Sequence, residues 1–544
     1  MRSSLFVHRV HRFNLPLVLF FSLFKRVRYW KSELSDISVR FPQLEWLDPE
    51  KLSDLDSWNS AQQGAYEKWS VLVLKVRDRL VGQARGVARG VEQRVALAFE
   101  AEILFEHLVS QCVEADATAI ILQTAWGQFF RKIGYRSSLG GRGSSVRTSA
   151  ASIPFEVASY WMRTAKSHAG QVWKCFARVS ADGRNAVREN LERNAKILVS
   201  GISLTEYPRS DVHLDFSFLV SNHHLLAEDV LYLLPRAPDL VTQQFLAKGG
   251  VRWLDASTYR GILNGTECIF AAAHVLFSAV FKAARWTHLF YSEIDQITSC
   301  TAPWRLIWQR YRPAIYLYSV SVSIPEPSEA SAFDGFGVAN VLWFYSANCF
   351  PLRKHSSSSL AKRVHWSNPV AQTIFGWNEE FGALVRNRLL VAGTIPKIVA
   401  LGPIMCGDSR DLQLDGQQSR RKIGIVPSGE GATGDYFLSV FDVSPVRAQI
   451  RESVGLGPDV YSFEFCDFFY RDLKLLLERN PRIRLIIKRK RSDPRNLRPI
   501  VGGLAQLIAD DGPWRRSNRV IQIDPEISPY LATSVLGGIT RTIC

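Results

Sequence analysis

The sequence predicts an α/β protein whose strands pair in parallel and are joined by helices. Apolar runs at Tyr436–Val443, Arg484–Ile487 and Val520–Ile523 are typical of strands covered on both faces. Helical patterns at Phe465–Glu478 and Leu497–Ala509 lie between these runs. Short loops that join alternating strands and helices indicate a parallel sheet with crossover connections. The C-terminal part of the chain is therefore predicted to be one such α/β domain.

The middle of the chain carries similar patterns. Ile315–Ile324 and Val338–Ser346 are rich in β-branched and aromatic residues, which is typical of strands. Ile398–Leu401 is predicted to be a third, shorter strand, and Asn378–Val385 is predicted to be helical. These elements extend the α/β prediction to the region before residue 415.

The N-terminal region is predicted to be helical. Residues 59–116 contain apolar side chains at near-helical spacing. Arg136–Ser152 is rich in Ser, Gly and Arg, which is typical of a linker. The apolar stretch Phe13–Phe24 lies between basic clusters and, at about a dozen residues, is too short to span a bilayer. It favours a packed helix over a surface anchor.

Composition narrows the class of partner. The 544 residues are 47% hydrophobic and 22% charged, which supports sizeable cores and excludes a globally disordered chain. The net charge of +16 indicates a phosphorylated substrate, anionic lipid or nucleic acid, with a solvated basic surface as the alternative. The eight cysteines form no C-x-x-C pair, so no zinc site is predicted, and free thiols fit a reducing cytoplasm.

The strongest chemical feature is the basic run Lys488–Arg491, which directly follows a predicted core strand. Ligands of open α/β sheets bind at the carboxyl ends of strands, where cationic side chains can hold a diphosphate. Eleven basic and three acidic residues lie between Arg482 and Arg519. A solvated loop and a patch for nucleic acid or anionic lipid are the alternative interpretations.

Two further segments are predicted to lie at the same edge. Asp442 and Ser444 follow the strand Tyr436–Val443 closely, although an Asp before a turn also bonds commonly to nearby amides. Ser528 and Tyr530 flank a proline at the start of a predicted helix, whose free amides suit phosphate. Plain helix capping is the alternative for Ser528.

Several segments together resemble the bacterial polysaccharide biosynthesis PFTS motif proteins, which are glycosyltransferase-like. In order, they are Val341–Ser346 (VLWFYS), Trp377-Asn378, Leu401–Met405 (LGPIM), Val440–Pro445 (VFDVSP), Lys488–Arg491 (KRKR) and Ser528–Tyr530 (SPY). The resemblance is clearest over residues 310–530.

The resemblance implies a GT-B-like architecture, with two Rossmann-like domains facing a cleft and a helical N-terminal region. Residues 1–150 would then be the helical region and linker, 151–415 the acceptor-side domain, and 416–544 the nucleotide-sugar domain. It further implies a role in O-antigen or capsule synthesis, in which a sugar passes from a nucleotide-sugar donor to a glycan or lipid-linked acceptor. No metal and no cofactor besides the donor substrate are expected.

The resemblance assigns roles at the predicted edge. Lys488, Lys490 and Arg491 would hold the donor diphosphate, Asp442 and Ser444 would line the nucleotide pocket, and Ser528 and Tyr530 would add contacts from the helix terminus. The sequence identifies no catalytic base. The expected location is the cytoplasm, with peripheral contact at the inner face of the plasma membrane.

The chain departs from the family in one respect. The Pro-Phe-Thr-Ser motif is expected on a strand after the helix at Ser528, whereas the chain reads LATSVLGGITRTIC over 531–544. The expectation is that this strand is missing, that its sheet edge is unpaired, and that the chain is C-terminally incomplete. An inactive remnant and a basic nucleic-acid-binding protein are the alternative functions, and no recognised nucleic-acid-binding motif supports the latter.

Overall fold

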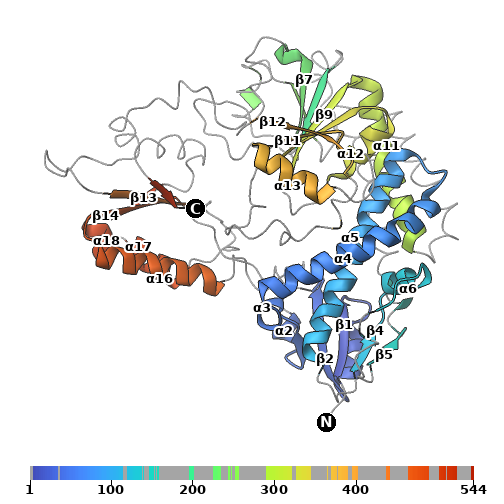
Figure 1. Cartoon of the computed structure of the whole chain (residues 1–544), viewed down its shortest axis with the longest axis horizontal. Helices are drawn as coiled ribbons and strands as arrows, with labels where there is room; N and C mark the ends of the chain where they lie inside the picture. The colour runs from blue at the N-terminus through green and yellow to red at the C-terminus, as the bar shows by residue number, and fades with distance from the viewer. Residues whose placement is uncertain are drawn as a thin grey trace. The chain divides into compact units, whose positions relative to one another are not determined.

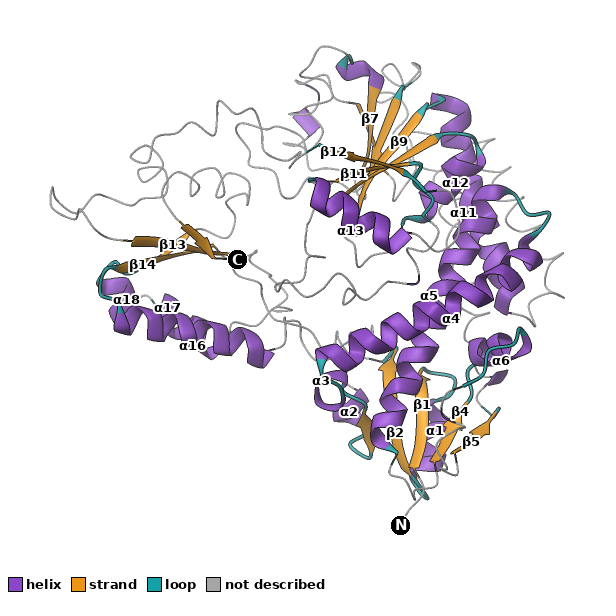
Figure 2. Cartoon of the chain, in the orientation of Figure 1, coloured by secondary structure: helices purple, strands orange, loops and turns teal. Residues whose placement is uncertain are grey.

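The computed structural model describes the residues that form three parallel sheets and their helices (Figures 1 and 2). The described ranges are 4–34, 37–113, 119–137, 146–151, 195–200, 225–234, 252–255, 289–320, 326–344, 369–376, 378–389, 395–401, 436–441, 463–488, 501–509, 511–523 and 541–543, with isolated positions at 139, 153–154, 156–157, 243–244, 247 and 364. The chain divides into two compact units, of which the first is Met1–Leu204 with Leu219–Gly402. The second is Thr205–Phe218 with Pro403–Cys544.

The first unit begins with a five-stranded parallel sheet. Its strands are β1 (Ser4–Val10), β2 (Arg26–Ser32), β3 (Leu44–Trp46), β4 (Ala119–Leu122) and β5 (Val146–Ser149), in the order β3-β2-β1-β4-β5. The connecting helices are α1 (Leu15–Ser22), α2 (Ile37–Arg40), α3 (Pro49–Leu52), α4 (Leu55–Leu80), α5 (Arg85–Cys112) and α6 (Ala125–Lys132). The strand order reverses between β1 and β4, as in doubly wound folds.

This sheet corrects the prediction of a helical N-terminal region. The long helices expected within 59–116 are confirmed as α4 and α5, which are separated by a turn at Gly82 with φ of 87°. The strands around them were not predicted, and β5 lies inside the predicted linker Arg136–Ser152. The stretch Phe13–Phe24 contains α1, which crosses from β1 to β2.

Two cores cover the faces of the N-terminal sheet. On one face, Phe6 and Trp30 pack against Phe105 of α5, and the Trp30 and Phe105 rings stack with centroids 6.3 Å apart. On the other face, Leu5 and Val18 belong to the core formed with α1 and α2. Burying a side chain of this size stabilises the folded state by about 1.5–3 kcal/mol. Strands that are covered on both faces bury side chains on both sides, so they need no alternation of apolar and polar residues.

The second sheet of this unit has seven parallel strands. They are β6 (Ile197–Ser200), β7 (Val230–Leu234), β8 (Arg252–Asp255), β9 (Ile315–Val320), β10 (Ala339–Phe344), β11 (Thr373–Gly376) and β12 (Lys397–Ala400), in the order β12-β11-β10-β9-β6-β7-β8. Its described helices are α11 (Leu289–Tyr311), α12 (Ser328–Gly335) and α13 (Glu379–Leu389), with a 3-10 turn at Ala227–Asp229. The strands predicted at 315–324, 338–346 and 398–401 are confirmed as β9, β10 and β12, and the helix predicted at 378–385 as α13.

Helix α5 contacts both parts of the first unit. Its C-terminal half packs on the N-terminal sheet through Phe105 and Leu108, and its N-terminal half packs against α12. A Cβ added at Gly86 would lie 1.8 Å from the Ser331 carbonyl oxygen. Close approach of the two helices therefore requires glycine at this position.

The second unit holds a four-stranded parallel sheet. Its strands are β13 (Tyr436–Phe441), β14 (Ile483–Lys488), β15 (Val520–Ile523) and β16 (Arg541–Ile543), in the order β15-β14-β13-β16. Helices α16 (Phe463–Arg479), α17 (Gly502–Ile508) and α18 (Pro513–Arg516) lie along the chain between these strands. Strands β13, β14 and β15 confirm the predicted C-terminal α/β domain.

The expectation of a missing strand is wrong. Strand β16 pairs with β13 in parallel, with Leu438 opposite Arg541 and Val440 opposite Ile543. A strand therefore follows residue 530, where none was expected, and it pairs along one side of β13. The four letters Pro-Phe-Thr-Ser do not occur in β16 or elsewhere in the sequence.

The structure confirms parallel α/β sheets and shows three of them among the described residues, where two domains were expected. The GT-B-like arrangement and the domain boundaries at 150 and 415 stay predictions. Within the described part of the chain, no helix is both long and apolar enough to cross a membrane.

Candidate functional site

The carboxyl edge of the C-terminal sheet is the first candidate site. Phe441 of β13, Lys488 of β14 and Ile523 of β15 are neighbours in register, so the three strands end at the same level. The chain continues from these ends with Asp442, Arg489 and Asp524. The residues that directly follow these strand ends in the sequence therefore include both acidic and basic ones.

Lys488 is the described member of the predicted basic cluster. Leu485 and Ile487 belong to the core formed with α16 and α17, and because side chains alternate along a strand, Lys488 lies on the opposite face. The residue is 2% exposed. An ammonium group with so little access to water interacts strongly with any negative charge near it.

The other predicted site residues lie outside the described residues. They are Asp442, Ser444, Lys490, Arg491, Ser528 and Tyr530. They are related to this edge by sequence alone, because they follow β13 and β14 closely or lie between β15 and β16. Their assignment to a donor site stays a prediction.

The structure describes several members of the basic run between Arg482 and Arg519 and places some of them away from the carboxyl edge. Arg482, Arg484 and Arg519 lie at the starts of β14 and β15, away from the carboxyl edge. Arg519 donates through Nη2 to the carbonyl oxygens of Leu477 and Asn480, both at 2.6 Å, and so caps the end of α16. Its role is structural, and the candidate diphosphate site is reduced to Lys488 and the residues that follow β14.

The strand order adds a feature that the sequence did not indicate. In the order β15-β14-β13-β16, the direction of winding reverses between β13 and β16. Ligands of open α/β sheets bind in the crevice outside the carboxyl ends at such a reversal. Asp442 and Ser444 follow one of the two strands concerned.

The N-terminal sheet has a second candidate site, which is a pocket of about 380 Å³ at its carboxyl edge. Residues of α5, β4, β5 and the start and end of α6 line it. The polar and charged lining residues are Glu102, Glu106, Gln123, Thr124, Arg131, Tyr135, Arg136, Ser137 and Thr148. Its volume suits a small ligand.

Two carboxyl groups dominate this pocket. Glu102 and Glu106 are four residues apart on α5 and share one face of the helix. The Thr124 hydroxyl donates to Glu102, and the Tyr135 hydroxyl donates to Glu106 Oε2 at 2.7 Å. Burial, which the Thr124 hydrogen bond opposes and the neighbouring carboxylates Glu156 and Glu106 reinforce, raises the pKa of Glu102 from 4.5 to about 8. Glu102 is therefore mostly protonated at neutral pH.

A carboxylate already occupies the start of α6 beside this pocket. Glu156 Oε2 accepts a hydrogen bond from the Ala125 amide at 2.7 Å, and the Thr124 side chain accepts one from the Gly127 amide. In many α/β folds the amides that open such a helix bind phosphate. Here the protein's own side chains satisfy them, so the pocket is poorly suited to a phosphorylated ligand.

A partly buried lysine lies near the end of β2. Burial and the nearby Arg9 guanidinium together lower the pKa of Lys31 on β2 from 10.5 to about 7, against the opposing effect of Glu100 and Glu102. The Lys31 Nζ lies 4.1 Å from the centre of the Trp30 ring. Next to it, the His8 ring makes edge contacts with Trp30 and Phe105, and burial lowers its pKa below the usual value.

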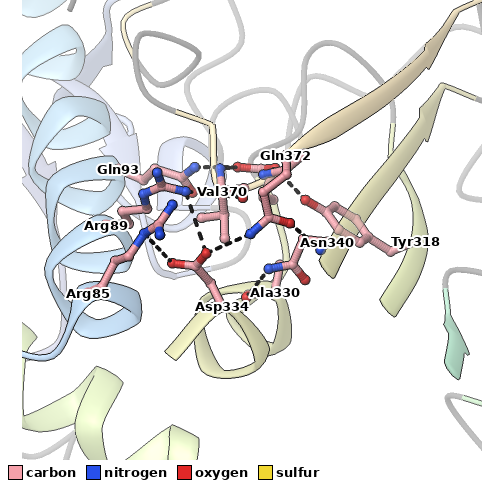
Figure 3. A network of polar contacts seen from close by, with 11 residues as sticks. Arg85, Arg89, Gln93, Tyr318, Ala330, Asp334, Asn340, Val370 and Gln372 are labelled. Carbon is pink, nitrogen blue, oxygen red and sulfur yellow. Dashed lines mark hydrogen bonds and ion pairs between the residues drawn. The ribbon is translucent and has the colours of Figure 1, made fainter. Parts of the chain in front are cut away.

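The network in Figure 3 joins α5 to the seven-stranded sheet. Glu326 accepts hydrogen bonds from Gln93 of α5 at 2.5 Å, from the Val370 and Ala371 amides at 2.6 and 3.0 Å, and from the Tyr318 hydroxyl. All four donors belong to the protein itself, so we interpret the role of the Glu326 carboxylate as structural.

Asp334 has a similar role in the network. It accepts from Gln372 Nε2 at 2.9 Å and pairs with Arg85 at 3.4 Å and Arg89 at 3.7 Å. Burial raises its pKa, and the two guanidinium groups oppose this shift. Because each group has a partner within the protein, we interpret the network as structural.

Among the described residues, no group of three or more His, Cys, Asp or Glu side chains is placed to hold a metal ion.

The family comparison agrees with the resemblance over the second half of the chain. The family model described as polysaccharide biosynthesis PFTS motif protein matches residues 283–535. This range includes β9–β12 of the seven-stranded sheet and β13–β15 of the C-terminal sheet, and it ends before β16. No curated protein matches the chain. The match indicates a role in polysaccharide biosynthesis.

Proposed function

We propose that the protein is a glycosyltransferase of bacterial surface polysaccharide biosynthesis, O-antigen or capsule among them, and that it uses a nucleotide-sugar donor. Two observations support the proposal. The family match covers the C-terminal sheet as far as β15, and the basic run Lys488–Arg491 begins at the carboxyl end of a central strand of that sheet. The acceptor is a glycan or a lipid-linked saccharide.

In the proposed reaction, an acceptor hydroxyl oxygen forms a bond to the anomeric carbon of the donor sugar. The bond from that carbon to the diphosphate oxygen breaks, and the nucleoside diphosphate leaves with an additional negative charge. The acceptor proton passes to a base that the described residues do not identify. The protein's contribution at the C-terminal sheet is to neutralise the leaving group.

Fixed cationic groups suit this step. Lys488 lies at the sheet edge with little access to water, so its charge is weakly screened. Lys490 and Arg491 follow within three residues and supply two more cationic groups. Preorganised charge of this kind stabilises developing negative charge without reorganising at the moment of reaction. Bond cleavage therefore proceeds without a metal ion in this proposal.

Asp442, Ser444, Ser528 and Tyr530 complete the proposed donor site. Asp442 and Ser444 follow β13 at the reversal of strand order, which suits contacts to the nucleoside. Ser528 and Tyr530 lie between β15 and β16 in the sequence and would contact the phosphates. The catalysed transfer would take place in the cytoplasm, where nucleotide-sugars are made.

Calorimetric titration with UDP, GDP, CMP and CDP at moderate salt tests the proposal. We expect at least one nucleoside diphosphate to bind, and the variant Lys488→Ala/Arg491→Ala to bind it more weakly. Removing one charge-assisted hydrogen bond to the diphosphate costs about 1.5–3 kcal/mol, or roughly 10- to 150-fold in Kd.

The matched control is Lys474→Ala/Arg479→Ala, which removes two charges from the surface of α16 in the same unit. Equal binding by wild type and Lys488→Ala/Arg491→Ala would exclude the proposed site. Nucleotide binding without sugar transfer to any acceptor would instead favour an inactive remnant. A steep linear fall of log affinity with log salt, together with binding to oligonucleotides, would favour a nucleic-acid-binding protein.

A further inference from the structure

Helix α1 presents an unusual surface for a helix that covers a sheet. Its inner side packs on the N-terminal sheet through Val18, with Leu15 and Leu19 beside it. The outer side of such a helix is ordinarily polar, because it faces water. The outer side of α1 and its flanking turns is apolar instead. Its exposed apolar residues are Phe13, Pro16, Phe20, Leu23 and Phe24.

These side chains form one continuous stripe. Successive members are separated by three or four residues, or are adjacent at the end, which places them along one side of a helix. Phe20, Leu23 and Phe24 are 57%, 69% and 63% exposed, and the Phe20 and Phe24 rings contact each other with centroids 5.6 Å apart. Clustered exposed apolar side chains mark an interaction surface more strongly than isolated ones do.

The charged residues of the sequence around the stripe have one sign. The first 32 residues contain seven Lys or Arg side chains and no Asp or Glu. Arg12 precedes the stripe, and Lys25 and Arg26 follow it. Glu45 of β3 pairs with Arg26 and Arg28 at 2.7 and 3.0 Å and offsets part of this charge, so one carboxylate is shared between two guanidinium groups.

We propose that α1 is an interfacial helix that docks the N-terminal sheet on an anionic lipid bilayer. Helices that lie on membranes bury an apolar side at the boundary between headgroups and acyl chains and are attracted to anionic lipids by basic residues, and α1 with its flanking residues supplies both features. The eight residues of α1 are far too few to span the bilayer, so the helix lies along its surface. Positive charge at both ends selects an anionic lipid surface over a neutral one.

This inference stands independently of the proposed function. The stripe and its charges belong to residues 12–26, outside the family match over 283–535. A glycosyltransferase with a lipid-linked acceptor would benefit from docking, because its acceptor lies in the same membrane. The docking surface would nevertheless exist if the donor site were absent.

Sedimentation of the full chain with vesicles tests the proposal. Vesicles of phosphatidylcholine alone are compared with vesicles that contain 30% phosphatidylglycerol on a molar basis, a probe composition of roughly the bacterial charge density. We expect binding to the anionic vesicles that weakens with added salt. Phe20→Ser/Leu23→Ser/Phe24→Ser is expected to lower the partition coefficient about 30-fold or more. Arg12→Gln/Lys25→Gln is expected to lower it roughly tenfold, at about fivefold or less for each charge.

The matched control is Val71→Ser/Leu74→Ser on α4. These side chains are 66% and 57% exposed, but Lys68, Lys75 and the acidic Glu67 and Asp78 surround them in the sequence. The control is expected to bind vesicles as wild type does. If the triple variant fails to fold, as judged by circular dichroism, Phe24→Ser alone and the charge variant carry the test.

Two results would overturn the proposal. One is a wild-type chain that does not bind anionic vesicles, or whose binding the α1 variants leave unchanged. The other is self-association in analytical ultracentrifugation that the triple variant abolishes while vesicle binding stays absent, because α1 would then be a contact between two copies. Nucleoside diphosphate titration of the triple variant separates this test from that of the donor site, since it is expected to bind as wild type does.

Discussion

The N-terminal and C-terminal sheets have related topologies and different charged residues at or after their carboxyl edges. Both contain parallel strands that run outwards from a first strand and then reverse, in the orders β3-β2-β1-β4-β5 and β15-β14-β13-β16. The N-terminal pocket is lined by Glu102 and Glu106 together with Arg131 and Arg136, and Glu156 lies beside it at the start of α6, whereas at the C-terminal sheet Lys488 ends β14 and Arg489–Arg491 follow in the sequence. The topology thus creates an edge at which a ligand can bind, and the side chains there decide which ligand it is.

The two sheets also differ in their contacts with the rest of the protein. Helix α5 ties the N-terminal sheet to the seven-stranded sheet through the Gly86 contact and the Glu326 and Asp334 network (Figure 3). The C-terminal sheet belongs to a separate compact unit. A change at the α5–α12 contact is therefore expected to affect one sheet and spare the other.

The largest predicted effect follows from this difference. Gly86→Val places side-chain atoms where the Ser331 carbonyl oxygen lies, so the helices must separate, at a cost of about 3 kcal/mol or more in the free energy of unfolding of the first unit. Chemical denaturation followed by tryptophan fluorescence measures it. Nucleoside diphosphate binding in the second unit is expected to persist.

Gly64→Ala is the control for this substitution. Gly64 lies within α4, and a Cβ added there meets nothing within 4 Å. The change is expected to stabilise the first unit by about 0.5–1 kcal/mol, because alanine favours helix over coil. Equal stability of the Gly86→Val and wild-type proteins would show that α5 and α12 are not in close contact.

The second prediction concerns pH and the acidic edge. The pKa of Glu102 is about 8 in the folded protein and 4.5 in the unfolded chain. Between these two pH values the folded protein therefore binds more protons than the unfolded chain does. The contribution of the Glu102 carboxyl group to the stability of the folded protein is fully present below pH 4.5 and is lost as the pH rises towards 8. Glu102→Gln is expected to reduce this decline in stability by about 1 kcal/mol or more.

Denaturation midpoints measured at intervals between pH 5 and 8 check this prediction. The comparison is the slope of stability against pH in the wild type and in Glu102→Gln, with Glu67→Gln on the exposed side of α4 as the control. A slope that Glu102→Gln leaves unchanged would mean that the carboxyl titrates normally, and the two edges would then differ less in their chemistry.

The smallest predicted effect concerns the start of α6. Glu156→Ala removes the carboxylate that accepts from the Ala125 amide and is expected to cost about 1 kcal/mol of stability. The comparison is Asp54→Ala at the start of α4. The Asp54 side chain accepts a hydrogen bond from the Ser57 amide at 2.6 Å, which is an ordinary helix N-cap. Thermal unfolding of both variants measures the loss. A Glu156→Ala protein as stable as wild type would show that its carboxylate does not occupy the start of α6.

The sequence predicted the C-terminal sheet well because its strands are buried on both faces. Strands β13, β14 and β15 are apolar runs bounded by turns, and each is found within about two residues of its predicted limits. Strand β16 was missed because Arg541–Ile543 is too short to show a pattern. Its place is decided by pairing with β13, which no local signal encodes.

The N-terminal sheet was missed for a different physical reason. Strands β1 (SLFVHRV) and β2 (RVRYWKS) contain His, Arg and Lys side chains that their surroundings accommodate. Lys31, for example, lies over the Trp30 ring, and the His8 ring packs between Trp30 and Phe105. Charged residues are typical of surface segments, so the strands were not recognised.

The candidate sites were predictable to different degrees. The position of Lys488 at the end of a strand followed from the sequence. The pocket of Glu102 and Glu106 did not, although two carboxylates four residues apart beside the apolar Ile103, Leu104 and Phe105 were a signal that could have been used. Tyr135 and Thr124 join that pocket from distant parts of the sequence, which only the fold reveals.

The most direct test of the account compares the two edges with one ligand. The nucleoside diphosphate that binds wild type best is titrated calorimetrically into Lys490→Ala/Arg491→Ala and into Glu102→Gln/Glu106→Gln. The account predicts that the first variant binds roughly 10-fold or more weakly and that the second binds as wild type does. Unchanged binding by Lys490→Ala/Arg491→Ala, with loss of binding in Glu102→Gln/Glu106→Gln, would contradict it.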